Sequence, residues 1–287
     1  MDAFCGWEES RITILQAPLD VTTSYVQGTN LGPKALIEAS RQVEYYDEEL
    51  KSETYRRGIA TLPPLKFKGD DPEPAVQLIE KTTADLLAAD KRVAMIGGEH
   101  TVTVGAVRAY RAAFHDLSVL HLDAHADLRE LYEGSPLSHA CVMARVREVC
   151  PYVSVGIRAW SQEEANTMER EGLSIFDIHT MRRDESWMDK AIERLGGTVY
   201  VTFDLDGLDP SIMPAVGTPE PGGMQWVETI RFLRRVFRER NVVGMDLVEL
   251  CPRPGAEYGE LTAARLFYRM IGYWTASENA GTGGSVG

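Results

Sequence analysis

Short runs of β-branched and apolar residues alternate with longer segments of helical periodicity along almost the whole chain. The short runs predict buried strands at 12–17, 93–96, 118–122, 153–157, 174–176, 199–203 and 242–247. The longer segments predict helices at 73–89, 101–114, 138–149, 185–195, 225–238 and 260–273. Alternation of this kind, without a long linker, is typical of an α/β domain in which helices cover both faces of one parallel sheet.

We expect residues 1–280 to form a single domain and residues 281–287 to be a flexible C-terminal tail. The chain has 287 residues, of which 44% are hydrophobic, and a chain of this length can bury a large core. Two Pro- and Gly-rich pieces, 62–74 and 213–223, are short and lie between predicted elements. We therefore interpret them as loops rather than as linkers between domains.

The net charge and the N-terminal sequence limit the expected localisation and the expected binding partners. The formal net charge is −13, which repels nucleic-acid phosphates and anionic lipid. The N-terminus lacks the basic and apolar regions of a signal peptide, and no apolar run approaches the roughly 20 residues that span a bilayer. The four cysteines form no Cys-x-x-Cys pair, so we interpret them as reduced thiols. We expect a cytoplasmic protein with no nucleic-acid and no membrane partner.

The segment Asp-Ala-His-Ala-Asp follows directly after one predicted strand. Ligands of parallel sheets bind beyond the carboxyl ends of the strands, where this segment would lie. If the chain stays extended, Asp123, His125 and Asp127 point to one side. Two carboxylates and an imidazole in an apolar setting require a cation that offsets their charge. The pattern therefore predicts a metal site, and a polar loop with a fortuitous pattern is the alternative.

Further candidate ligands follow other predicted strands. Asp204 and Asp206 end one strand at alternate positions, His100 follows a second, and Glu249 follows a third. Asp209, which precedes a proline, is better interpreted as a turn residue. Two histidines and four aspartates can hold two divalent metals, and oxygen and nitrogen ligands without thiolate favour manganese.

In this order, the motifs resemble those of the ureohydrolase family of arginases and agmatinases, and the agmatinase branch most closely. The resemblance extends over nearly the whole chain and rests on residues 17–20, 28–33, 97–100, 123–127, 138–139, 204–210, 217–223 and 246–249. It implies an arginase-like fold, which is a single three-layer α/β domain with a mostly parallel sheet of about eight strands. It also implies a homo-oligomer, either a trimer or a hexamer.

The resemblance implies two Mn²⁺ ions per subunit, with other divalent metals as alternatives. The first ion would be held by His100, Asp123, Asp127 and Asp204. The second ion would be held by Asp123, His125, Asp204 and Asp206, so that Asp123 and Asp204 bridge the pair.

The resemblance also assigns three catalytic roles. Glu249 would accept hydrogen bonds from the guanidinium group of a small cationic substrate, and Asp127 would pass a proton to the leaving amine. His139 would stand at the mouth of the site as a proton shuttle. The implied reaction cleaves agmatine to urea and putrescine by attack of a metal-bridging hydroxide, which is a step of polyamine biosynthesis.

Several alternatives stay open. A guanidinobutyrase or an arginase-like enzyme would share the metal motifs, although arginases carry Asn where this chain has Arg129. A two-metal phosphohydrolase lacks support, because the chain has no Gly-rich phosphate cradle, and a non-catalytic metal-bound scaffold is a further alternative.

Several other residues with reactive or polar side chains have no role in the family pattern. His115, His121 and His179 are interpreted as structural or surface residues, although His121 lies on the ligand side of its strand and is able to contact a ligand residue. Arg158 and Trp160 follow a strand end, where they either line the entrance or pack within the scaffold. Cys141 and Cys251 are interpreted as small packing residues near the pocket.

Overall fold

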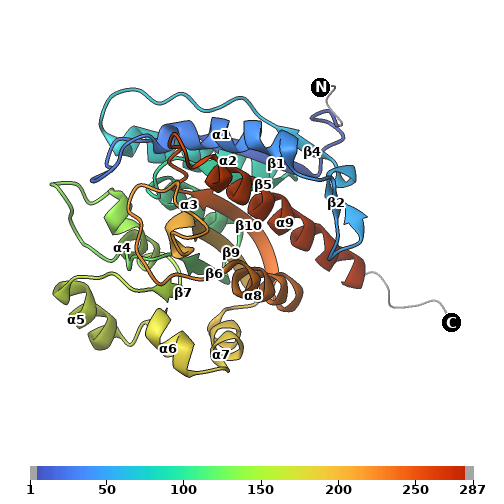
Figure 1. Cartoon of the computed structure of the whole chain (residues 1–287). Helices are drawn as coiled ribbons and strands as arrows, with labels where there is room; N and C mark the ends of the chain where they lie inside the picture. The colour runs from blue at the N-terminus through green and yellow to red at the C-terminus, as the bar shows by residue number, and fades with distance from the viewer. Residues whose placement is uncertain (1–4, 282–287) are drawn as a thin grey trace.

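A single parallel sheet of eight strands organises the computed structural model, which describes residues 5–281 (Figure 1). The strand order is β4-β1-β5-β10-β9-β6-β7-β8, and every neighbouring pair is parallel. The strands are β1 (Ile12–Ala17), β4 (Ile59–Thr61), β5 (Arg92–Gly97), β6 (Leu117–Leu122), β7 (Tyr152–Ile157), β8 (Ser174–Asp177), β9 (Thr198–Asp204) and β10 (Asn241–Val248). The predicted parallel sheet of about eight strands is confirmed.

Helices cover both faces of the sheet, as the alternation of elements predicts (Figure 1). Along the central strands, neighbouring side chains enter different apolar clusters: Ala94 and Ile96 of β5 point to one face, and Val93 and Met95 to the other. One face is packed by α1 (Gly32–Ala39), α6 (Ile178–Arg183), α7 (Trp187–Arg194), α8 (Trp226–Glu239) and α9 (Glu257–Gly281). The other is packed by α2 (Pro72–Ala88), α3 (Val102–Ala113), α4 (Val142–Val146) and, in part, α5 (Gln162–Glu171).

Several elements differ from the prediction. The expected helix 138–149 is a 3₁₀ turn (His139–Cys141) followed by the short helix α4. The edge strand β4, the hairpin of β2 (Tyr46–Asp47) and β3 (Ser52–Glu53), and the helices α1, α5 and α6 were not predicted. These elements are short or mostly polar, so they lack the apolar periodicity on which the prediction rests.

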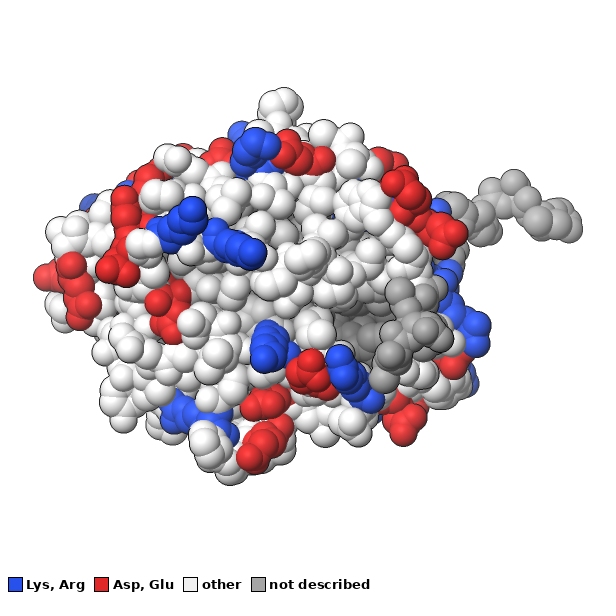
Figure 2. Space-filling view, turned by 90° about the horizontal axis from the view of Figure 1, so that it is seen from above, with Lys and Arg blue, Asp and Glu red and all other residues white. Residues whose placement is uncertain are grey.

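The surface, the helices and the C-terminal end relate to two expectations: that the protein has no membrane partner and that it ends in a flexible tail. On the face seen in Figure 2, basic and acidic side chains are interspersed around a broad area without charge. Within residues 5–281, no helix combines the length and apolar character needed to cross a bilayer. The helix α9 reaches Gly281, and the rest of the tail predicted at 281–287 lies outside the described residues.

The strand order brings the predicted site residues to one place. The strands β5, β10, β9 and β6 are consecutive neighbours in the centre of the sheet. Because they are parallel, their carboxyl ends meet at one edge of the sheet. His100 follows β5, Glu249 follows β10, Asp204 ends β9 and Asp123 follows β6. Residues from distant parts of the chain therefore meet at this edge.

Candidate metal centre

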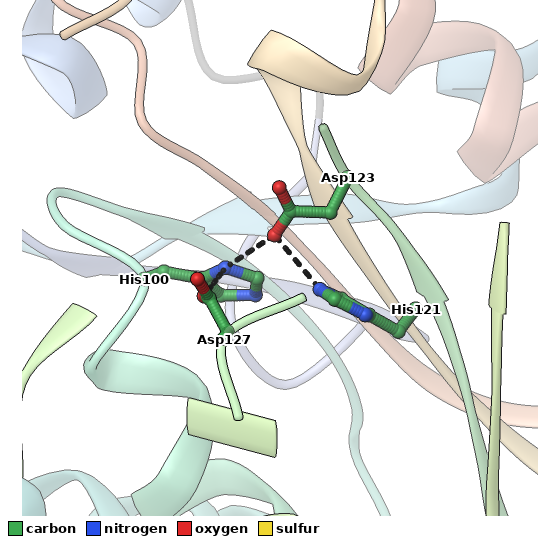
Figure 3. A group of neighbouring side chains, drawn as sticks. All are labelled: His100, His121, Asp123 and Asp127. Carbon is green, nitrogen blue, oxygen red and sulfur yellow. Dashed lines mark hydrogen bonds and ion pairs between the residues drawn. The ribbon is translucent and has the colours of Figure 1, made fainter. Parts of the chain in front are cut away.

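His100 lies at the centre of a buried group of carboxylates. Its Nδ1 atom is 3.1 Å from Oδ2 of Asp123, 3.1 Å from Oδ2 of Asp127 and 3.2 Å from Oδ2 of Asp204. All four side chains are buried. Figure 3 shows His100 and Asp127 on one side of Asp123, with His121 on the other. The structure thus brings together the residues that the sequence predicts for a first metal.

Hydrogen bonds determine which nitrogen of His100 faces the carboxylates as an acceptor. The Thr202 hydroxyl donates its proton to Asp246 at 2.7 Å, so the contact of 2.9 Å between His100 Nε2 and this hydroxyl requires a proton on Nε2. The Thr103 and Tyr200 hydroxyls also donate to Asp246, at 2.9 Å and 2.7 Å. In the neutral ring, Nδ1 then carries a lone pair and no proton.

The convergence of Nδ1 and three carboxylate oxygens is the observation that fits a cation. Within the described part of the chain, this buried atom has no hydrogen-bond partner. A lone pair that faces three carboxylate oxygens is stable only if a positive charge lies between them. Burial lowers the pKa of His100, but the three carboxylates raise it well above its usual range, so protons and metal ions compete for this position.

A second group lies beside the first and shares Asp123 with it. Nδ1 of His125 is 3.0 Å from Oδ2 of Asp206 and 3.6 Å from Oδ1 of Asp123. Oδ1 of Asp123 therefore faces this second group, whereas its Oδ2 faces His100. The residues that could hold a metal ion form two sets that share Asp123: His100, His121, Asp123 and Asp127, and Asp123, His125 and Asp206. Asp204 turns one oxygen to His100, and its other oxygen accepts the backbone N–H of Asp206 at 2.9 Å.

The ionisable groups of the centre shift one another in opposite directions. Burial raises the pKa of Asp204 well above its usual range, and the charges of Asp206 and Asp123 raise it further. Burial and the charge of Asp123 also raise the pKa of Asp127. The pKa of Asp123 is lowered well below its usual range, because the neighbouring histidines outweigh its burial. A carboxylate cluster with these shifts lacks charge compensation, which a divalent metal provides.

The backbone of the first motif differs from the expected extended strand. The strand β6 ends at Leu122, and Asp127 has a left-handed φ of +52°. The carbonyl of Asp127 accepts the N–H groups of Met143 and Ala144 at 2.9 and 3.1 Å, which fixes this turn. The prediction that the chain stays extended is therefore wrong. The turn divides the motif, so that Asp127 joins His100 while His125 joins Asp206.

Glu249 lies next to the first group. Its Oε1 atom accepts the backbone N–H of His100 at 2.7 Å, and burial raises the pKa of its carboxyl well above the usual range. Glu249 also has a left-handed φ of +64°. Non-glycine residues in this conformation cost on the order of 1–3 kcal/mol and are common at functional sites. Both Asp127 and Glu249 are thus held in conformations that the surrounding structure must stabilise.

His139 lies at the mouth of the site. Together with His125, Asp127 and Trp160 it lines a cavity of about 340 Å³ that opens to the surface. Its Nδ1 is 3.3 Å from the Thr22 hydroxyl and its Nε2 is 3.2 Å from the Ser24 hydroxyl. The imidazole is therefore held between polar groups beside the candidate metal ligands.

Sequence analysis missed the polar residues that support the ligands. Thr202 of β9 and Asp246 of β10 are neighbours in register, both are fully buried, and both contact the Thr103 hydroxyl of α3. An aspartate inside a predicted buried strand is the signal that could have identified this support. His121 is buried on the ligand side of its strand: its Nε2 contacts Oδ2 of Asp123 at 2.8 Å and its Nδ1 contacts the Ser154 hydroxyl at 2.9 Å.

Nearly the whole chain is similar to known proteins in both sequence and fold. A model of the arginase family matches residues 10–272. An N(1)-aminopropylagmatine ureohydrolase of Synechocystis sp. is 39% identical, over 96% of this chain and 93% of the relative. An agmatinase of Bacillus cereus is 35% identical, over 86% of both chains. The crystal structure of the agmatine ureohydrolase of Thermoplasma volcanium superposes with a TM-score of 0.88 at 31% identity, covering 97% of this chain and 94% of that one.

The hydrogen bond from His100 to Thr202 yields a first prediction. Replacement Thr202→Val should weaken manganese binding about 10–100-fold, because His100 loses the acceptor that fixes its tautomer. The measurement is a calorimetric titration of the metal-free protein with Mn²⁺.

Thr13→Val is the matched control. Thr13 is also a fully buried strand residue, but its hydroxyl has no hydrogen-bond partner within the described chain. Its replacement should leave the affinity unchanged. Equal affinities for Thr202→Val and the unmodified protein would contradict the role of the Thr202 hydroxyl.

Proposed function

This chain belongs to the arginase family, and from that premise we propose that it is a metal-dependent ureohydrolase of a small cationic guanidine. The observation that carries the proposal is the position of His100 Nδ1, 3.1–3.2 Å from the oxygens of three buried carboxylates. Glu249 lies beside this group and supplies a further carboxylate for a cationic group. The cavity lined by His125 and Asp127 connects the centre to the surface.

We assign the metal-binding residues from the two groups described above. The first ion would be held by His100, Asp123, Asp127 and Asp204, and the second by Asp123, His125, Asp206 and, through the resemblance, Asp204. This set of nitrogen and oxygen ligands without thiolate supports manganese as the metal. When bound, divalent ions lower the pKa of water and polarise the group that is attacked.

The overall reaction adds water to the guanidinium carbon. A C–O bond forms, the C–N bond to the alkyl chain breaks, and the products are urea and a protonated amine. Glu249 would bind the guanidinium through Oε2, because its Oε1 is engaged by the His100 N–H. Asp127 would transfer a proton to the leaving nitrogen, since its carboxylate lies between His100 and the cavity. His139 would exchange protons with solvent at the mouth.

Two amines are candidate substrates. Agmatine fits the resemblance on which the assignment of catalytic residues rests, and its hydrolysis yields putrescine. N(1)-Aminopropylagmatine is the second candidate, because the Synechocystis relative with that name is more similar to this chain than the Bacillus cereus agmatinase. Its hydrolysis yields urea and spermidine. Both substrates are cationic at the end opposite the guanidine, which the acidic chain attracts.

A urea-release assay with added Mn²⁺ tests the function. We expect kcat/KM to be highest for agmatine or N(1)-aminopropylagmatine and at least about tenfold lower for 4-guanidinobutyrate and arginine, because a carboxylate is repelled by the acidic centre. Removal of metal by a chelator should abolish urea release, and Mn²⁺ should restore it. Absence of urea from all four compounds would reject the proposal. Preference for 4-guanidinobutyrate would reject both cationic substrates and favour the guanidinobutyrase alternative.

Replacement of Asp127 tests the proposed proton transfer. Asp127→Asn should lower kcat about 10²–10⁴-fold, because the amide cannot carry the proton, while Mn²⁺ still binds. Steady-state kinetics and a metal titration on the same sample separate the two effects. Asp85→Asn, on the exposed surface of α2, controls for the loss of one negative charge. An Asp127→Asn protein with normal kcat would refute this role.

Replacement of Glu249 tests guanidinium binding. Glu249→Gln should lower kcat/KM about 10–100-fold, because a hydrogen bond to a charged group contributes about 1.5–3 kcal/mol. Glu163→Gln, an exposed change in the first turn of α5, serves as the control. Unchanged kcat/KM in the Glu249→Gln protein would show that the guanidinium binds elsewhere.

A further inference from the structure

We propose that Arg158 is a positioning residue for the second metal position, which is formed by Asp123, His125 and Asp206; this inference rests on the proposed function. Arg158 follows β7, and sequence analysis left open whether it lines the entrance or packs in the scaffold. The cavity at the mouth is lined by Trp160 but not by Arg158. Arg158 is half-buried behind the site, where it connects the chain segments that carry His125 and Asp206.

The guanidinium of Arg158 binds the backbone of the loop that follows β9. Within the described chain, each of its hydrogen bonds ends on a carbonyl oxygen rather than on a carboxylate. The acceptors are the carbonyls of Gly156 at 3.0 Å, Asp206 at 2.7 Å, Gly207 at 3.3 Å, Leu208 at 3.3 Å and Glu220 at 2.8 and 3.3 Å. A planar guanidinium with five donors can span such a set, and an ammonium group cannot.

The backbone of Arg158 and Ala159 binds the loop that carries His125. The N–H groups of Arg158 and Ala159 donate to the carbonyl of Ala124 at 2.8 and 2.9 Å. The carbonyl of Ala159 accepts the N–H of Ala126 at 3.1 Å, and Ala159 pairs with His125 as an isolated parallel bridge. One short segment therefore holds the His125 loop through its backbone and the Asp206 loop through the Arg158 side chain.

The surrounding residues leave room for this arrangement. A Cβ atom on Gly223 would lie 2.7 Å from Nη2 of Arg158, and one on Gly207 would lie 3.0 Å from the backbone N of Asp123. The Thr218 hydroxyl donates to Oδ2 of Asp206 at 3.0 Å, from the same loop as Glu220, whose carbonyl Arg158 binds. The position of Asp206 thus depends on two loops that Arg158 joins.

Burial of Arg158 without a directly bonded carboxylate needs compensation. Burial lowers its pKa, and the charges of Asp206 and Asp123 oppose this effect. The carbonyl dipoles solvate the guanidinium in place of water. His100 and Asp127 make none of these contacts, so a change at Arg158 should disturb the second metal position and leave the first one intact.

The test is a calorimetric titration of metal-free protein with Mn²⁺. The unmodified protein should bind two ions. Arg158→Lys should bind the first ion with unchanged affinity and the second about 10–100-fold more weakly, as is typical when the support of a ligand is removed. Mn²⁺ electron paramagnetic resonance supplies a second readout, because the signal of a coupled pair should give way to that of a single ion at equal metal content.

Arg240→Lys is the matched control. Arg240 is also half-buried and donates to the carbonyls of Glu239 and Ile192, on the α7 and α8 side of the sheet. The Arg240→Lys protein should bind both ions with the same affinities as the unmodified protein. Thr218→Val, which removes the hydroxyl that donates to Oδ2 of Asp206, should weaken the same second ion.

The outcomes separate the two proposals. Fewer than two ions in the unmodified protein would contradict the metal pair of the proposed function. Two ions of unchanged affinity in Arg158→Lys would overturn the role of Arg158 alone. Loss of both ions in Arg158→Lys would also overturn the proposed role. The same holds if Arg158→Lys fails to fold while Thr218→Val binds both ions at full affinity. In both cases Arg158 would be a general structural residue.

Discussion

The uncompensated negative charge at the centre of the sheet edge is the constraint on which the rest of the site depends. Burying an ion costs several kcal/mol unless its partners compensate it. The raised pKa values of Asp204 and Asp127 reflect this cost, and the raised pKa of His100 reflects the attraction of the same carboxylates for a positive charge. A divalent metal offsets all of these terms together. Metal binding and the ordering of the surrounding loops are therefore linked in free energy.

The strand order explains how the chain concentrates these groups. Because β10 lies between β5 and β9, Glu249 reaches the backbone N–H of His100, and the buried Asp246 reaches Thr202. The same carboxylate that fixes Thr202 therefore also fixes the tautomer of His100. The supporting hydrogen bonds join side chains of β9, β10 and α3, whereas the candidate ligands lie beyond the strand ends. Regular elements thus support ligand residues that irregular loops carry.

The sequence predicted the sheet and the candidate ligands because both leave local patterns. Apolar runs mark the buried strands, and acids or histidines directly after those runs mark the strand ends. The left-handed turn at Asp127 and the role of Arg158 leave no such pattern. Each depends on contacts with distant residues, such as the N–H groups of Met143 and Ala144 or the carbonyl of Glu220. Short elements such as β4, with three residues, contain too few residues to show a periodic pattern.

In the proposed function, different parts of the site would govern the chemistry and the choice of substrate. The buried centre and Glu249 would recognise only the guanidine end, which agmatine and its aminopropyl derivative share. Discrimination between the two would then come from the mouth of the cavity, where we expect the amine chain to lie. There the guanidinium of Arg129 lies 5.3 Å from the ring centre of Tyr132, so this ring face already holds a cation. Trp160, which is 42% exposed, is then the aromatic group at the mouth with surface left to contact an ammonium group.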